Sequence, residues 1–252
     1  MPFSPELKER YPSIAKYEIL GDDYKESHDG RETALLEFIY NHPSLSMDRL
    51  RGSPATILQA MDEFSAQTDF LINISWDKGG KVADLIKQDK PAVLVELGGY
   101  VGYSAILFGD AARQAGTEGV KLWSIEYDPL IASIAMNLID LAGLSDIVKV
   151  VVGSATDTIR RLKVNGDLQK IDFWFLDHDE DLYVQEFKLC EELDFFPAGA
   201  LVVADNVVRP GAPQYREYVR QHSGVESWGV PGLIIPGDFA VSCAGERFSF
   251  HR

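Results

Sequence analysis

Cysteine is scarce in this sequence, with only Cys190 and Cys243 among 252 residues. Two cysteines supply neither a disulfide framework nor the paired spacing of a zinc site. They favour two reduced, partly buried thiols in a cytoplasmic protein. The chain is therefore expected to be stabilised by an ordinary hydrophobic core rather than by cross-links or a structural metal.

The sequence also lacks long apolar runs and an excess of basic residues. No run approaches the about 18 apolar residues of a membrane-spanning helix. The first residues, MPFSPELKERYPSIAKYEIL, are dense in charge and lack the apolar segment of a signal peptide. With 24 Lys and Arg against 39 Asp and Glu, the net charge is −15. Because nucleic acids and anionic membranes would repel it, we expect neither as a partner, but a small-molecule substrate instead.

The chain shows no internal repeat and no linker rich in Pro, Gly or Ser. We predict a polar N-terminal arm over residues 1–30, irregular or loosely helical, followed by one domain over residues 31–252. Helical spacing of apolar residues predicts helices at Glu32–Asn41, Ser53–Phe70 and Lys78–Gln88. These three helices precede the first predicted strand and form an N-terminal helical cap.

From Ala92 onward, short apolar runs alternate with helical patterns. Five strand-then-helix units predict a parallel sheet covered on both faces. The predicted strands are Ala92–Glu96, Lys121–Ile125, Val148–Val152, Ile171–Leu176 and Ala200–Ala204, and the helices are Gly102–Ala115, Leu130–Ala142, Ser154–Leu162, Glu180–Leu193 and Ala212–His222. Near the C-terminus, Gly232–Ile235 and Phe239–Cys243 flank a Pro-Gly-Asp turn and predict a closing hairpin. The fold class is an α/β, doubly wound, Rossmann-like sheet, mostly parallel, with an antiparallel C-terminal hairpin.

A glycine-rich turn, VELGGYVGYSA, follows the first predicted strand. Gly98, Gly99 and Gly102 allow a tight turn and a close approach of a ligand to the backbone. A dinucleotide fingerprint would need glycine where Leu97 stands, and Glu96 precedes the first glycine. This pattern is closer to the nucleoside loop of methyltransferases that use S-adenosyl-L-methionine (SAM), whose positive amino-acid end attracts a carboxylate. A plain strand-to-helix turn is the alternative.

The second predicted strand ends in WSIEYDP, which places Glu126 at its tip. A carboxylate there is suited to accept both ribose hydroxyls of a nucleoside. The alternative is a helix-capping acid, but Asp128, directly before Pro129, suits the cap better. Glu126 is therefore predicted to bind the ligand.

An acidic cluster, FLDHDEDLY, follows the fourth predicted strand, and Asp205 and Asn206 follow the fifth. If these strands are neighbours, Asp177, Asp205 and Asn206 converge. Oxygen ligands, two of them anionic, suit Mg²⁺ or another divalent cation, whereas the spacing does not fit an EF-hand loop. For Asp-Asn after a strand, an ordinary turn is the alternative.

The chain resembles the catechol O-methyltransferase family in motifs that share the family's order and spacing: VELGGYVGYSA, SIEYDP, VVGSATD, FLDHDEDLY, ADNV and PGAP. The similarity runs from about Glu32 to Arg220 and includes LINISWDKGGKVAD. It implies a SAM-binding fold with a divalent cation chelated by a vicinal diol. It assigns the metal to Asp177, Asp205 and Asn206, and the acceptor to Phe70 (an aromatic gatekeeper), Asp179 and Asn206. It assigns SAM to Asn73, Ile74, Glu96, Gly98, Tyr100, Ser104, Glu126, Tyr127, Ser154, Ala155, Asp177 and His178.

Two positions depart from the family pattern. The family reads Asp-His-x-Lys, and its lysine removes the proton from the attacked hydroxyl, but here that position is Glu180. Asp179 stands where the family usually has tryptophan. Glu180 is a candidate catalytic base beside Asp177, while the alternative is a first-turn helix acid. The family's catechol-gripping glutamate has no clear match, with Glu226, Asp238 and Glu246 as candidates.

The sequence thus predicts a cytoplasmic SAM-dependent, Mg²⁺-assisted O-methyltransferase acting on a small catechol-like or hydroxylated aromatic. Two alternatives stay open: the same fold with altered chemistry, such as N-methylation or a non-methylating reaction in secondary metabolism, and a SAM-binding protein without turnover. Related enzymes occur as monomers and as homodimers, and the sequence does not decide between them.

Overall fold

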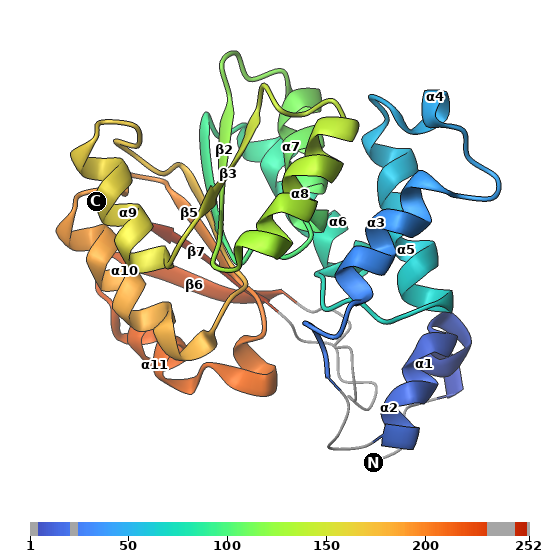
Figure 1. The fold of residues 1–252 in the computed structure, drawn as a ribbon. Coiled ribbons are helices and arrows are strands. Elements are labelled where there is room, and N and C mark those ends of the chain that lie inside the picture. The colour runs from blue at the N-terminus through green and yellow to red at the C-terminus, as the bar shows by residue number, and fades with distance from the viewer. Residues whose placement is uncertain (1–4, 21–24, 231–244, 251–252) are drawn as a thin grey trace.

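The computed structural model describes residues 5–20, 25–230 and 245–250 (Figure 1). A seven-stranded sheet with the order β3-β2-β1-β4-β5-β7-β6 runs through its centre. The first five strands are parallel, and β7 is antiparallel to both of its neighbours. The strands are β1 (Val93–Leu97), β2 (Lys121–Glu126), β3 (Val148–Val152), β4 (Phe173–Leu176), β5 (Leu201–Ala204), β6 (Val225–Val230) and β7 (Gly245–Phe250). The predicted α/β class, with a mostly parallel sheet, is confirmed.

Helices cover both faces of the sheet, as Figure 1 shows. One face carries α3 (Arg31–Tyr40), α5 (Pro54–Gln67), α6 (Ser75–Asp89), α7 (Tyr103–Ala115) and α8 (Pro129–Leu141). The other carries α9 (Ala155–Val164), α10 (Tyr183–Glu192) and α11 (Pro213–Gln221). Strand β4 shows why both faces are apolar: Phe173 and Phe175 pack into the first core, and Trp174 and Leu176 into the second.

Most predicted elements lie within a few residues of the observed ones. The largest shifts are of three residues: α6 begins at Ser75 instead of Lys78, α5 ends at Gln67 instead of Phe70, and α10 begins at Tyr183 instead of Glu180. Between Gln67 and Ser75 the chain forms a loop, because Thr68 and Asp69 both hydrogen-bond back to the Phe64 carbonyl and end the helix. The prediction did not include α4 (Met47–Leu50), the turn η4 (Val207–Gly211) or the strands β6 and β7, and the start of the helix predicted at Glu180–Leu193 is the separate helical turn η3 (Glu180–Leu182).

The N-terminal arm contains α1 (Pro5–Arg10), the turn η1 (Pro12–Ile14) and α2 (Ala15–Leu20). Its Tyr11 and Ile14 are buried against Phe70, with the Tyr11 and Phe70 rings edge to face at 5.9 Å. The buried Arg31 ties this region together, because its guanidinium donates to the Phe70 carbonyl at 2.5 Å and pairs with Asp29 at 2.7 Å. The arm therefore packs beside the loop that follows α5.

The predicted hairpin strands at Gly232–Ile235 and Phe239–Cys243 lie outside the described residues. The antiparallel pair that the structure does contain, β6 and β7, flanks that segment. Cys190 is a free thiol and is fully buried, more deeply than predicted, while Cys243 is not among the described residues. Within the described part of the chain, no helix has the length and apolarity needed to span a membrane.

Candidate functional site

The site lies at the carboxyl ends of β1, β4 and β5. The chain runs outward from β1 to β3 and then returns to β4 on the other side of β1, so the strand order reverses between β1 and β4. Ligands of open α/β sheets bind outside the strand ends at this point. The residues that follow these strands, Gly98, Asp177 and Asp205, are therefore brought together by topology.

Gly98 makes the closest backbone contact at this edge. Its N–H donates to the Ile125 carbonyl at 2.9 Å, and its φ is +89°. A Cβ on this residue would lie 2.1 Å from the Asp177 carbonyl oxygen. Only glycine fits, because both the positive φ and the neighbouring backbone exclude a side chain.

Glu126 organises the glycine loop from the tip of β2. Its Oε2 accepts a hydrogen bond from the Tyr100 N–H and its Oε1 accepts one from the Asp128 N–H, both at 2.8 Å. Burial raises the pKa of Glu126, while these backbone donors lower it. Asp128 accepts from the Leu130 and Ile131 N–H groups, which confirms its predicted role as the cap of α8. Each carboxylate oxygen has two acceptor sites, so Glu126 retains acceptor capacity for a ligand.

Glu96 is a buried acid with one unused oxygen. The Ser124 hydroxyl donates to its Oε1 at 2.5 Å, and Ser104 contributes a second side-chain hydrogen bond. Burial raises the pKa of Glu96 to about 7, although these two hydrogen bonds lower it. Its Oε2 has no hydrogen-bond partner among the described residues. An unsatisfied buried oxygen of this kind calls for a donor, and a ligand ammonium would supply one.

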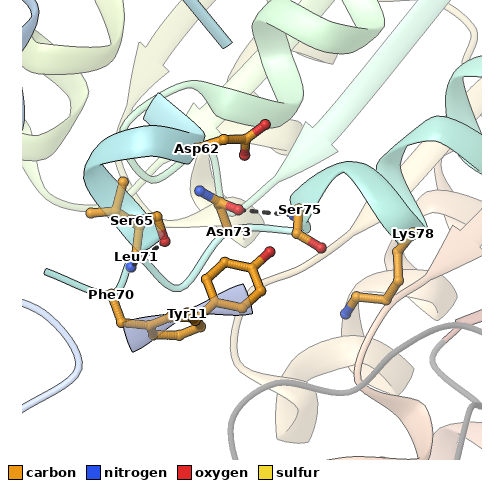
Figure 2. Close-up of a pocket in the computed structure, with 8 residues that line it drawn as sticks. All are labelled: Tyr11, Asp62, Ser65, Phe70, Leu71, Asn73, Ser75 and Lys78. Atoms are coloured by element: carbon orange, nitrogen blue, oxygen red, sulfur yellow. Dashed lines mark hydrogen bonds between the residues drawn. The ribbon is translucent and has the colours of Figure 1, made fainter. Parts of the chain in front are cut away.

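A small pocket lies between the arm and the start of α6 (Figure 2). Tyr11, Phe70, Leu71, Asp62, Ser65, Asn73, Ser75 and Lys78 line it. Asn73 accepts from the Ser75 N–H at 2.9 Å, whereas its buried Nδ2 has no partner among the described residues. Ile74 is buried directly before α6. The predicted gatekeeper Phe70 and Asn73, which the resemblance assigns to SAM, therefore both line this pocket, whereas Ile74 does not.

Asp177, Asp205 and Asn206 are adjacent, as the neighbouring strands require. Leu176 and Ala204 pair in register, and the Asp205 N–H donates to the Leu176 carbonyl at 2.9 Å. Burial raises the pKa of Asp177 well above its ordinary value, and the nearby Asp205 carboxylate adds to this shift. Asn206 has a φ of 60°, and its N–H donates to Asp205 Oδ1 at 2.7 Å. Two carboxylates and an amide thus gather at one sheet edge.

Lys78 also lies at this edge, although the sequence interpretation did not single it out. Its Nζ lies 2.5 Å from Asp205 Oδ2, across 127 positions of sequence. In the LINISWDKGGKVAD stretch, the resemblance singled out only Asn73 and Ile74, for SAM. Lys78 follows them in the first turn of α6, and its side chain extends toward Asp205. Tyr11 was likewise missed, because nothing in a polar arm signals contact with a pocket.

The FLDHDEDLY cluster is divided between several roles. Asp179 caps the turn η3 by accepting from the Asp181 N–H at 3.1 Å, and Glu180 is the first residue of that turn. Burial raises the pKa of Glu180, and Asp179 and Asp205 add to the shift. His178 Nε2 lies 2.5 Å from Oε2 of the buried Glu186 as an ion-pair contact, and neither ring nitrogen of His178 has a hydrogen-bond partner among the described residues. Glu180 thus lies in the first turn of a helical segment, as the alternative to a catalytic base predicted. Its carboxyl is also close enough to Asp205 for the two charges to interact.

Three residues that the resemblance assigns to SAM, Tyr127, Ser154 and Ala155, lie on the far side of the glycine loop from Asp205. Tyr127 follows β2 and is 78 % exposed. Ser154 caps α9 by accepting from the Asp157 N–H at 3.2 Å, and Ala155 begins that helix. These residues lie after β2 and β3, on the side of β1 opposite Asp205. A nucleoside lying across the strand ends would reach from one set to the other.

The candidates for the catechol-gripping glutamate are spread over the C-terminal region. The backbone of Glu246 pairs with Ala204, directly before Asp205, whereas Glu226 lies on the outer strand β6. Asp238 is outside the described residues. Within the described ranges, no three His, Cys, Asp or Glu side chains are grouped to hold a metal. The predicted ligand set has only two carboxylates, with an amide as its third member.

Comparisons with known proteins show the family of this chain. A sequence profile of the O-methyltransferase family matches residues 52–222. The chain is 34 % identical over 196 residues to catechol O-methyltransferase from Bos taurus, an alignment that covers 78 % of this chain and 68 % of that protein.

This chain belongs to the catechol O-methyltransferase family.

A bacterial relative is similar over more of its length. A probable O-methyltransferase from Mycobacterium tuberculosis is 34 % identical over 228 residues, covering 84 % of this chain and 93 % of that protein. The chain spans 68 % of the bovine and 64 % of the mouse catechol O-methyltransferase. The family places the chain among O-methyltransferases.

Solved structures share the fold at lower identity. The O-methyltransferase TomG from Streptomyces achromogenes, determined with SAM, has a TM-score of 0.64 and 18 % identity, covering 99 % of this chain and 100 % of that one. An O-methyltransferase from Bacillus cereus, in complex with SAH, has a TM-score of 0.62 and 17 % identity, covering 97 % of this chain and 99 % of that one. Both likenesses confirm the Rossmann-like architecture of the methyltransferase.

Proposed function

We propose that this protein transfers a methyl group from SAM to a hydroxyl of a small catechol-like or hydroxylated aromatic, assisted by Mg²⁺ or another divalent cation. The observation that carries the proposal is the meeting of Asp177, Asp205 and Asn206 beside a glycine loop that has a buried, partly unsatisfied glutamate. The proposed cofactor pocket and the proposed cation ligands then share one edge of the sheet. The methyl group of SAM and the hydroxyl oxygen of the acceptor would meet there.

The residues around the glycine loop fit SAM. Glu96 Oε2 and Asn73 Nδ2 are a buried acceptor and a buried donor without partners among the described residues, and they suit the ammonium and the carboxylate of a methionine moiety. Glu126 stands at the strand tip for the ribose hydroxyls. At Gly98 the loop lies directly against the Asp177 backbone, which holds the glycine loop next to the proposed cation ligands.

The donor set of Asp177, Asp205 and Asn206 fits a hard divalent cation. Burial raises the pKa of Asp177, and repulsion from the neighbouring Asp205 carboxylate raises it further. A dication would be bound by those two carboxylates and the Asn206 amide oxygen, with positions left for a diol. When bound, it would lower the pKa of an acceptor hydroxyl. Phe70 and Tyr11 would bind and orient the aromatic ring, and Glu180 would accept the hydroxyl proton.

A second candidate is N-methylation of an amine acceptor. Glu180 and Asp179 make this edge more acidic than the family's lysine and tryptophan would, and Asp62 adds a carboxylate to the neighbouring pocket. An acidic surrounding favours a cationic amine. The acceptor class remains a proposal, as do a cytoplasmic location, which the reduced Cys190 supports, and a small molecule as the partner.

Calorimetry and an acceptor screen test the proposal. SAM is expected to bind with micromolar affinity, and methyl transfer is expected with catechols and MgCl₂ but not after chelation with EDTA. Transfer to amines alone would support the second candidate. Absence of SAM binding would overturn both candidates.

The pH dependence of SAM binding provides a test of Glu96. Below about pH 7 this carboxyl is protonated and does not attract the ligand's ammonium, so SAM affinity is expected to rise with pH, by up to about tenfold per unit, between about pH 5.5 and about pH 7. Glu96→Gln is expected to weaken binding at pH 8 and to flatten the profile. Calorimetry at several pH values measures this.

Asp62→Asn is the matched control, because burial raises the pKa of Asp62 to about 6 but the residue lies outside the glycine loop. This variant is expected to keep the pH dependence. A flat profile in the unmodified protein would contradict the assignment of Glu96.

A further inference from the structure

The ammonium of Lys78 lies beside the carboxylates at the ends of β4 and β5, although Lys78 is far from them in the sequence. Lys78 extends from the first turn of α6, and its Nζ lies 2.5 Å from Asp205 Oδ2. The two side chains are 16 % and 4 % exposed, so water screens their attraction little. Figure 2 shows Lys78 at the border of the pocket, which makes its ammonium a neighbour of both the pocket and the carboxylate pair.

The ammonium partly neutralises that pair. The Lys78 Nζ lies 2.5 Å from Asp205, and Asp205 follows β5, the strand that pairs in register with the strand that Asp177 follows. Two adjacent carboxylates in a poorly hydrated place need a compensating positive charge, because an unpaired buried charge is strongly destabilising. Among the described residues, the ion-pair partner of Asp205 is Lys78.

The helix that carries Lys78 is held firmly, while the side chain itself can move. A Cβ at Gly79 would lie 2.7 Å from Leu107, so α6 packs directly against α7 and has no room to shift toward it. The lysine has a flexible four-carbon stem and can leave Asp205 without any change in the helix. The ion pair is therefore an exchangeable contact on a rigid support.

We propose that Lys78 is the internal counter-cation of this site: it occupies Asp205 when no dication is bound and competes with the dication for that carboxylate. The inference rests on the proposed function, because it takes Asp205 to be a cation ligand. A positive charge a few ångström from a dication repels it, so Lys78 lowers the dication affinity that two carboxylates alone would have. It also explains how the chain tolerates the carboxylate pair before a cation arrives.

The test is a titration of the full-length protein with MgCl₂ and with MnCl₂ by calorimetry. Lys78→Met is expected to bind either cation roughly tenfold more tightly, and Lys78→Arg, which keeps the charge, is expected to stay close to the unmodified protein. Lys81→Met is the matched control, because Lys81 lies on the same helix, pairs with Asp77 at 3.9 Å and is expected to leave the affinity unchanged.

Thermal unfolding in EDTA gives a readout that needs no cation. Lys78→Met is expected to lower the melting temperature, because Asp205 loses its partner, and Asp205→Asn in the same chain is expected to recover part of the loss. Added MgCl₂ is expected to raise the melting temperature of Lys78→Met more than that of the unmodified protein.

The outcomes separate this inference from the proposed function. Unchanged or weaker cation binding in Lys78→Met, with binding intact in the unmodified protein, overturns the inference alone. Cation binding by Lys78→Met but not by the unmodified protein supports it. Absence of binding in every variant overturns both the cation part of the proposed function and this inference, while SAM titrations on the same samples still decide the cofactor part.

Discussion

Replacing Asp205 with alanine is expected to reduce methyl transfer by roughly a thousandfold at saturating SAM. A dication's stabilisation of developing charge is worth several kcal/mol, and about 1.4 kcal/mol corresponds to a factor of ten in rate. The variant removes one of two carboxylates and releases Lys78 into the site. Transfer of a labelled methyl group to the best acceptor of the screen, at several MgCl₂ concentrations, measures the effect.

Asp181→Ala is the matched control for this experiment. Asp181 belongs to the same acidic cluster but is exposed and lies in the turn η3, and its loss is expected to change the rate less than about threefold. SAM affinity is expected to be similar in both variants, because Asp205 is not assigned to the cofactor. Full activity of Asp205→Ala, with an unchanged response to MgCl₂, would refute the cation site.

Gly98→Ala is expected to destabilise the fold and to abolish SAM binding. The added Cβ would lie 2.1 Å from the Asp177 carbonyl oxygen, which is held in place because the Asp177 N–H donates to Leu97 at 3.0 Å. Left-handed backbone costs about 1–2 kcal/mol in a residue other than glycine, and overpacking costs about 1–3 kcal/mol more. The melting temperature should fall by roughly 10 °C, as measured by calorimetric or fluorescence unfolding.

Gly116→Ala separates the two causes. Gly116 ends α7 with a φ of +73°, and no atom would lie within 4 Å of its added Cβ. It therefore carries the conformational cost alone, about 1–2 kcal/mol, and should bind SAM normally. Equal losses of stability in the two variants would show that contact with Asp177 does not restrict position 98.

The five parallel strands were predictable because the alternation of short apolar runs with helical patterns is a local feature of the sequence. Strand β3 was predicted with both of its observed ends, and β1, β2, β4 and β5 within two residues. The glycine loop was predictable for the same reason, since positive φ values favour glycine at Gly98 and Gly102. The start of α6 was not predictable from the spacing of apolar residues. It depends on a hydrogen bond from the Ser75 N–H to the Asn73 side chain, and that spacing carries no information about such a bond.

The sequence by itself determined the α/β class, the order of strands and helices along the chain, and the residues that follow each strand. Only the tertiary structure decided which of those residues meet. Asp177 and Asp205 come together because β4 and β5 are neighbours in the sheet, and strand neighbours are chosen by packing over long sequence distances. Lys78 reaches Asp205, and Tyr11 reaches Phe70, for the same reason: side chains meet where packed helices and strands place them, and no local pattern of residues records such a contact.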